Sequence, residues 1–276
     1  NHTNIRAIGL CNCPINMIND MSQKFFCSTD DLFLDFVGIN HLIWAQKVLL
    51  RGKDVTAEAI EKICDASSKE IMANIPEVHY SPEFLRSLGM IPVSYLKYFY
   101  LQPQMLEECL ADSKSKGVRG EVVKGVESEL FMLYQNTDLK EKPEQLARRG
   151  GARYSDAACS LIDSIYNNKK DIQVVNVMNS GCNLDLPENA VIERNCVIDS
   201  NGAHPIQIGH TPLKIRGLLQ NVKAYEQLTI QAAIYGDRDA ALQALAIHPL
   251  VNSAETARLM LNDILSENQA FLPNFA

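Results

Sequence analysis

The chain has 276 residues, of which 46% are apolar, and its formal net charge at pH 7 is −7. This length and apolar content are enough to bury a sizeable core in one large domain or two small ones. The negative charge, without a block rich in Lys or Arg, disfavours duplex nucleic acid and anionic membranes as main partners. The apolar runs are too short to cross a bilayer, and nothing at the amino terminus resembles a signal peptide.

Eight cysteines are scattered through segments that we expect to be buried. This usage is typical of a reduced, cytoplasmic protein in which a free Cys packs as a small apolar side chain. No two of them have CxxC spacing, which disfavours a thioredoxin-like motif and a zinc ribbon. The eight are Cys11, Cys13, Cys27, Cys64, Cys109, Cys159, Cys182 and Cys196.

The first fifty residues predict a strand, a helix and a pair of strands. The segment 5–10 (IRAIGL) predicts a buried strand. The segment 15–26 has apolar residues at helical spacing, with Pro14 near the first turn, where its missing N–H costs nothing. The segment 32–50 is rich in β-forming residues and is broken by Gly38, which predicts two strands with a bend or bulge between them.

From residue 54 onward the pattern is mostly helical. A helix is predicted to begin at Asp54 or Thr56, and the segment 119–135 carries apolar residues on one helical face. Between them, four prolines in 75–103 predict irregular structure. The later predictions are two helices flanking Gly150-Gly151, strands at 171–181 and 190–199, and helices from Pro212, Asp237 and about Ser253. The whole predicts an α+β fold with more helix than strand.

Cys11 and His41 are candidate metal ligands. Cys11 lies where the first predicted strand gives way to a helix, and a helix amino terminus favours the thiolate that binds metal. His41 lies between two apolar runs, where strand ends gather at a sheet edge. A Cys/His pair with open positions would be a catalytic site, because a structural zinc needs four protein ligands. A buried Cys and a hydrogen-bonded His remain the alternative, and Cys13 is expected to point away from Cys11 and to serve in packing.

The segment 148–158 (RRGGARYSDAA) is a second candidate. Its two glycines admit unusual backbone angles or the close approach of a ligand, and a helix opens at Tyr154 or the next residue. A tyrosine beside Arg149 and Arg153 would have a lowered pKa, as a tyrosine base requires, and a nearby metal would lower it further. The alternative is a helix-capping turn with solvated arginines.

Five segments form an ordered set that is more specific than any one of them. They are GLCNCPINM (9–17), GINHLIW (38–44), RGGARYSDAACSLIDSIYN (149–167), VVNVMNSG (174–181) and VKAYEQLTIQAAIYGDRDAALQALAIHPLV (222–251). In this order they resemble the 6-phospho-β-glucosidase branch of glycoside hydrolase family 4. The resemblance implies an α+β, lactate/malate dehydrogenase-like carboxyl-terminal domain, helix-rich with a small, mostly antiparallel sheet.

The family depends on NAD⁺ and a divalent metal, usually Mn²⁺, rather than on a carboxylate pair. The resemblance implies that NAD⁺ takes hydride from C3 of a 6-phosphoglucosyl unit, and that the ketone so formed acidifies the proton on C2. The metal holds the C2 and C3 oxygens, a tyrosine removes the C2 proton, the aglycone leaves, water adds, and NADH returns the hydride. The substrate would be a phosphorylated disaccharide or β-glucoside, such as phosphorylated cellobiose.

Carried over residue by residue, Cys11 and His41 match the metal ligands and Tyr154 matches the catalytic base. Asn12 matches a substrate-contacting position that is typically Asp in the α-glycosidase branch, which points to β-linked substrates. Asn40 and Arg149 are also expected to contact substrate.

Residues 1–276 would form the metal- and substrate-binding carboxyl-terminal domain. The glycine-rich turn of the family's NAD-binding Rossmann domain is missing from this sequence, so no cofactor-binding residue is expected and the isolated chain should be inactive. Relatives associate largely through this half, so a homodimer or homotetramer is expected.

Three positions depart from the family pattern. Met178 stands where relatives tend to have Arg, Arg153 replaces a common aromatic residue beside the tyrosine, and Cys13 replaces a common Val. Loss of an Arg would remove an anchor for the sugar phosphate, for which Arg153 would compensate. Two alternatives therefore remain: a non-catalytic sugar-phosphate-binding or assembly module, and a family 4 enzyme for another phosphorylated or acidic glycoside.

Overall fold

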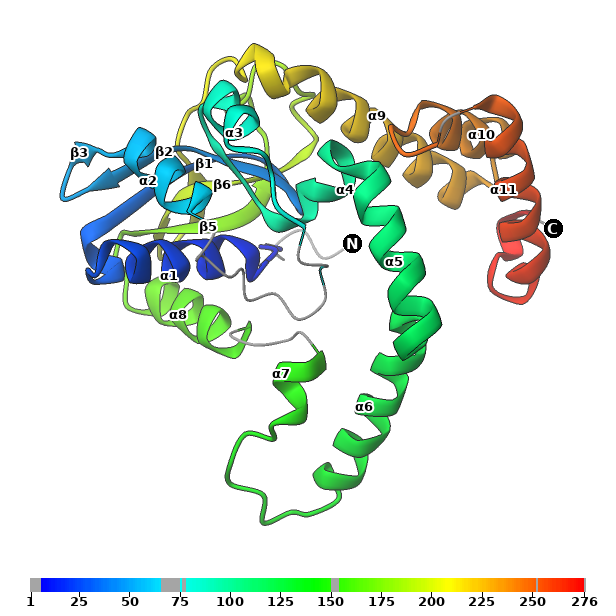
Figure 1. The fold of residues 1–276 in the computed structure, drawn as a ribbon, viewed down its shortest axis with the longest axis horizontal. Helices are drawn as coiled ribbons and strands as arrows, with labels where there is room; N and C mark the ends of the chain where they lie inside the picture. The colour runs from blue at the N-terminus through cyan, green and yellow to red at the C-terminus, as the bar shows by residue number, and fades with distance from the viewer. Residues whose placement is uncertain (1–5, 66–74, 76–77, 150–153, 252, 276) are drawn as a thin grey trace. The chain divides into compact units, whose positions relative to one another are not determined.

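The computed structural model describes residues 6–65, 75, 78–149, 154–251 and 253–275 (Figure 1). The chain divides into two compact units, the first made of residues 1–177 and 192–206 and the second of residues 178–191 and 207–276. The strands are β1 (Leu32–Ile39), β2 (Leu42–Leu50), β3 (Lys53–Asp54), β4 (Ile91–Pro92), β5 (Asp171–Met178), β6 (Val191–Asp199) and β7 (Gly202–Pro205). The helices are α1 (Cys13–Phe25), α2 (Thr56–Cys64), α3 (Pro82–Leu88), α4 (Lys97–Tyr100), α5 (Gln102–Lys116), α6 (Arg119–Tyr134), α7 (Gln145–Arg149), α8 (Tyr154–Tyr166), α9 (Leu213–Tyr235), α10 (Arg238–Ile247) and α11 (Ala254–Glu267).

A long β-hairpin forms the core of the first unit. Strands β1 and β2 pair in antiparallel register from Leu32↔Leu50 to Ile39↔Leu42, and β3 and β4 each add a short antiparallel pairing to β2. The two strands predicted in 32–50 are therefore confirmed. Gly38 is not the bulge but a point of close approach, because a Cβ there would lie 2.2 Å from the carbonyl oxygen of Leu42.

The irregularity in this hairpin lies between Asp35 and Phe36, where side chains of β6, the middle strand of the second sheet (order β5-β6-β7), contact β1. The side-chain oxygen of Asn195 accepts from the Phe36 N–H at 2.7 Å, and its amide donates to the Leu34 carbonyl at 2.9 Å. The buried Arg194 donates to the Asp35 carboxylate and to the Phe36 carbonyl. These buried bonds satisfy backbone groups that the bulge leaves unpaired, and they join the two sheets.

The second unit combines a loop and three helices. Helix α10 packs against both α9 and α11, and its first turn is capped by Asp237, which accepts from the Ala240 N–H at 2.9 Å. Helices predicted from Pro212, Asp237 and Ser253 are thus confirmed. In the described part of the chain, no helix is both long and apolar enough to span a membrane.

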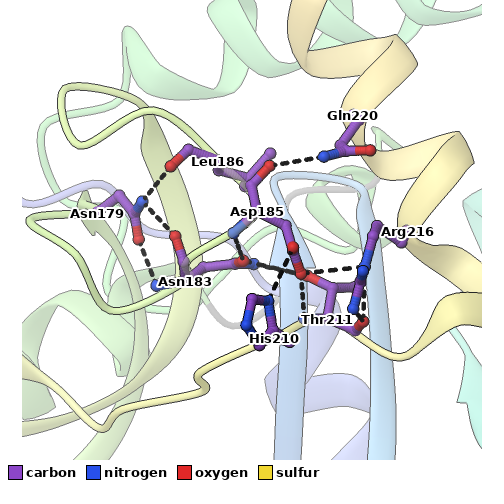
Figure 2. Close-up of polar contacts among 8 residues, drawn as sticks. All are labelled: Asn179, Asn183, Asp185, Leu186, His210, Thr211, Arg216 and Gln220. Atoms are coloured by element: carbon purple, nitrogen blue, oxygen red, sulfur yellow. Dashed lines mark hydrogen bonds and ion pairs between the residues drawn. The ribbon is translucent and has the colours of Figure 1, made fainter.

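A network of hydrogen bonds and ion pairs joins the loop of the second unit, residues 178–191, to the start of α9 (Figure 2). The Asn179 amide donates to three backbone carbonyls, those of Asn183, Leu186 and Pro187. Asp185 accepts from the Thr211 N–H at 2.6 Å, contacts His210 Nδ1 at 3.0 Å and pairs with Arg216 at 3.1 Å.

Two sequence predictions of structure were wrong. Residues 6–10 form no strand and are not buried; only Gly9 forms an isolated bridge, with Asn176. The segment 75–103 was expected to be irregular, yet it contains α3, α4 and the start of α5. Pro82 and Pro103 stand in the first turns of α3 and α5, where a proline is tolerated.

Candidate metal and active site

Three potential metal ligands meet in the first unit. One ligand atom each from Cys11, Cys13 and His41 lies within 4.8 Å of the other two. Both thiols are buried, with 1% and 3% of their residues' surface exposed, whereas His41 is exposed. The cluster is therefore anchored in the core and open on its imidazole side, as a site that must admit a ligand requires.

The segment before α1 places the two thiols. Reciprocal backbone bonds between Gly9 and Asn176 hold the chain against β5, at 2.9 and 2.8 Å. Asn12 then adopts a helical conformation (φ −84°, ψ −10°), and the Cys13 N–H points at the Cys11 sulfur at 3.5 Å. Cys13 was expected to point away from Cys11. That expectation was wrong because it required extended backbone at residue 12.

The β1–β2 turn places the imidazole. His41 has a left-handed backbone (φ 63°), which is uncommon for a residue with a side chain. Its ring stacks on Tyr95, with ring centroids 4.2 Å apart and planes 18° apart. The tight hairpin and the stacking partner together fix the direction of the ring, so the imidazole is positioned before any metal binds.

The two thiols titrate in opposite directions. The pKa of Cys11 falls to about 5, chiefly because the Cys13 thiol donates to the Cys11 sulfur, with a further contribution from His41, against the opposing effect of burial. The same contact, together with burial, raises the pKa of Cys13. The metal-free pair thus holds one negative charge at neutral pH, on the sulfur that the sequence predicted as a ligand.

Glu193 lies beneath this cluster and was missed at the sequence level. It is fully buried, accepts from the Asn176 amide at 3.2 Å and from the His41 backbone N–H, and its Oε2 has no partner among the described residues. Burial, and then the charge of Cys11, raise the pKa of its carboxyl to about 8. The signal that could have identified it was a run of three polar residues, Glu193 to Asn195, inside a strand that is otherwise mostly apolar.

Tyr154 is the first residue of α8, as predicted, and lies at the cluster. The backbone N–H of Asn12 donates to its hydroxyl oxygen, and 40% of the residue is exposed. Its pKa is raised, first by burial and then by the two thiols, so the expected lowering by neighbouring arginines was wrong. Arg149 is instead engaged with Glu127 at 2.7 Å. Arg153 and Gly150-Gly151 lie outside the described residues.

The remaining predicted residues differ in how close they come to the site. Asn12 is buried between the two thiols, and its side-chain oxygen lies 4.0 Å from the Cys13 sulfur. Asn40 is exposed in the same turn as His41. Met178 is 60% exposed at the end of β5. The structure therefore brings together Cys11, Asn12, His41 and Tyr154, and shows Arg149 in an exposed ion pair.

This arrangement has the parts of a metal-assisted proton-transfer site. Thiolate and imidazole donors converge from two elements, the imidazole side is open, and a tyrosine hydroxyl lies next to the same segment. A cation bound there would lower the tyrosine pKa by direct electrostatic attraction to the phenolate.

The comparisons with known proteins agree with one another. The family 4 glycosyl hydrolase C-terminal domain matches residues 36–251. A probable 6-phospho-beta-glucosidase of Bacillus subtilis is 41% identical over 270 residues, which are 98% of this chain and 61% of that protein. The 6-phospho-beta-glucosidase of Escherichia coli is 37% identical over 277 residues, again 98% of this chain and 61% of that protein.

Solved structures show the same relationship. The 6-phospho-beta glucosidase of Thermotoga maritima with NAD and glucose-6-phosphate has a TM-score of 0.84 at 32% identity, over 96% of this chain and 61% of that one. Another structure of that protein contains manganese, NAD⁺ and glucose-6-phosphate, with a TM-score of 0.82. The chain spans about three fifths of the length of these relatives. It belongs to glycoside hydrolase family 4, as the five ordered segments indicated.

Proposed function

We propose that the protein containing this chain hydrolyses 6-phospho-β-glucosides with NAD⁺ and a divalent metal, and that residues 1–276 are its metal- and substrate-binding part. The observation that carries this proposal is the convergence of Cys11 and His41, with Tyr154 at the same segment. The T. maritima enzyme, of the same family, holds manganese, NAD⁺ and glucose-6-phosphate. The NAD-binding domain is proposed to lie outside residues 1–276.

The residues present fit a divalent metal. Cys11 supplies a thiolate at neutral pH because its pKa is about 5, and His41 supplies a fixed imidazole. The open side leaves positions for two substrate oxygens. When bound, the metal supplies Lewis-acid stabilisation of negative charge on the C2 and C3 oxygens, and NAD⁺ supplies a hydride acceptor.

Tyr154 is proposed as the base that takes the proton from C2. Its hydroxyl is held by the Asn12 N–H, a donor that stabilises the phenolate needed for this role. The same backbone segment carries Cys11, so the base and the metal ligand are positioned together. Asn12, Asn40 and Arg149 are proposed to contact substrate; Arg149 would first have to leave Glu127.

The test is hydrolysis of a chromogenic 6-phospho-β-glucoside with NAD⁺, Mn²⁺ and a reductant. The full-length protein should be active and residues 1–276 alone inactive. Tyr154→Phe should lower kcat by about 10²- to 10⁴-fold, with Tyr166→Phe, in the same helix but 86% exposed, as the matched control. The two variants losing equal activity would contradict the assignment of the base.

Two outcomes would redirect the proposal. Binding of Mn²⁺ and glucose-6-phosphate by the full-length protein without any turnover would favour the non-catalytic sugar-phosphate module. Turnover of other phosphorylated or acidic glycosides alone would favour another specificity within the family, a possibility that Met178 motivates. The cytoplasmic location and the homodimer or homotetramer remain predictions, to be checked by cell fractionation and light scattering.

A further inference from the structure

Cys13 lies close enough to the proposed metal ligands to bind the same ion. Tetrahedral zinc sites have bonds of about 2.3 Å to sulfur and 2.0–2.1 Å to nitrogen, which puts neighbouring ligand atoms roughly 3.5–3.8 Å apart. The three donor atoms of Cys11, Cys13 and His41 already lie within 4.8 Å of one another. Side-chain shifts of about 1 Å would bring all three onto one ion.

The environment of Cys13 directs its thiol toward the proposed ligands. The residue is 3% exposed, its thiol donates to the Cys11 sulfur, and its contact with the Asn12 side-chain oxygen is weak, at 4.0 Å. It is the first residue of α1, a helix of 13 residues, and its backbone N–H points at the Cys11 sulfur at 3.5 Å. A cation bound by Cys11 and His41 would therefore have the Cys13 sulfur beside it as a third donor.

We propose that Cys13 is a third protein ligand, so that this chain presents a Cys–Cys–His donor set that takes Zn²⁺ or Co²⁺ in preference to Mn²⁺. The inference rests on the proposed function for the roles of Cys11 and His41, and adds the third ligand and the metal preference. Thiolates select thiophilic ions, whereas Mn²⁺ prefers oxygen ligands. Three protein donors still leave room for the two substrate oxygens, because a catalytic zinc with three protein ligands can expand from four to five ligands.

The experiment titrates the metal-free full-length protein with Co²⁺ in a phosphine reductant. Each cobalt–thiolate bond contributes near-ultraviolet charge-transfer absorption, so two thiolates should give roughly twice the intensity of one. Cys13→Val keeps the buried volume apolar, and Cys13→Ala serves if the larger side chain impairs folding. Cys159→Ser is the control, because Cys159 is an exposed thiol of the same chain.

The expected result is a charge-transfer band that loses roughly half its intensity in Cys13→Val and none in Cys159→Ser. Competition should show Zn²⁺ displacing Mn²⁺ at least tenfold more readily in the wild type than in Cys13→Val. An unchanged band and an unchanged Zn²⁺/Mn²⁺ preference in Cys13→Val would overturn the inference while leaving the proposed function intact. Undiminished Co²⁺ binding by both Cys11→Ser and His41→Ala would overturn the site itself and the proposed function with it.

Discussion

The Cys11–Cys13–His41 cluster and the Asp185 network both bring together side chains from segments far apart in the sequence. They differ in whether each polar atom has a bonding partner. In the second unit, Asp185 has a partner for each oxygen: His210 for one, and Arg216 and the Thr211 N–H for the other (Figure 2). In the first unit, three donor atoms face one another, and Oε2 of Glu193 beneath them has no partner among the described residues.

This difference separates a structural network from a binding site. A buried polar group normally has a hydrogen-bond partner, and a network in which the partners are all present holds the fold. Donor atoms that converge on one point, with bonding capacity still available, are arranged to bind a further group such as a cation. We therefore expect substitutions of the three donor residues Cys11, Cys13 and His41 to change function, and substitutions in the Asp185 network to change stability.

The largest expected effect is that of Cys11→Ser. Removing the thiolate should weaken metal binding and raise the activation free energy of the reaction by about 4 kcal/mol. This corresponds to about a 10³-fold loss of kcat in the full-length protein. The midpoint of thermal unfolding of the metal-free protein should change little, because Ser fills nearly the same volume. Cys159→Ser is the control for loss of a thiol. A stability loss in Cys11→Ser as large as that of an Asp185 variant would break the distinction between the two regions.

Glu193→Gln should produce the next largest effect, and one that depends on pH. The pKa of Glu193 is about 8 in the folded state, above its value in the unfolded chain, so the folded state binds the extra proton. The contribution of the Glu193 carboxyl to the free energy of unfolding is fully present below about pH 4 and is lost as the pH rises through 8. Relative to wild type, the metal-free Glu193→Gln protein should gain on the order of 3 kcal/mol between pH 5 and 8.5.

The measurement is urea unfolding of metal-free wild type and variant at several pH values, and the quantity compared is the difference between their free energies of unfolding. Taking the difference removes most of the contribution of Cys11, whose pKa of about 5 lies in the same range. Glu188→Gln is a control on an exposed carboxyl group. A difference that stays flat from pH 5 to 8.5 would show that Glu193 is ionised throughout.

Asp185→Ala should lower stability by about 2 kcal/mol while leaving Co²⁺ binding by the full-length protein unchanged. The substitution leaves the Thr211 N–H without its acceptor and Arg216 without its ion-pair partner. The pKa of Asp185 is lowered, because His210, the Thr211 N–H and Arg216 outweigh the effect of burial. The wild type should therefore lose this stability as the pH falls below about 4, and the variant should not. Urea unfolding at pH 7 and pH 3 tests both statements.

The sequence identified some residues of the metal site and missed others, and the difference has physical reasons. Cys11, Asn12, His41 and Tyr154 belong to the ordered segments, so family resemblance identified them together. Cys13 was misjudged because the direction of its side chain depends on one backbone conformation, that of Asn12, which no periodicity reveals.

The sequence also failed to predict contacts between residues that are far apart along the chain. Glu193 reaches the site from β6, and Asn195 in the same strand satisfies the backbone at Phe36, 159 residues away. Similarly, the apolar run before Cys11 satisfies the pattern of a strand, yet its single bridge to Asn176 depends on where β5 lies. Helices with their own capping signals, such as α10, were predicted well because those signals are local.

The smallest expected effect is that of His210→Ala, which tests whether every contact in the Asp185 network matters. His210 Nδ1 lies 3.0 Å from Asp185, but the His210 side chain is 66% exposed, so solvent screens the pair. Its loss should cost less than about 1 kcal/mol at pH 6, well below the cost of Asp185→Ala. Because Thr211 and Arg216 still occupy the carboxylate, the network keeps its buried partners. A cost equal to that of Asp185→Ala would mean that the exposed imidazole, rather than the buried bonds, holds this loop to α9.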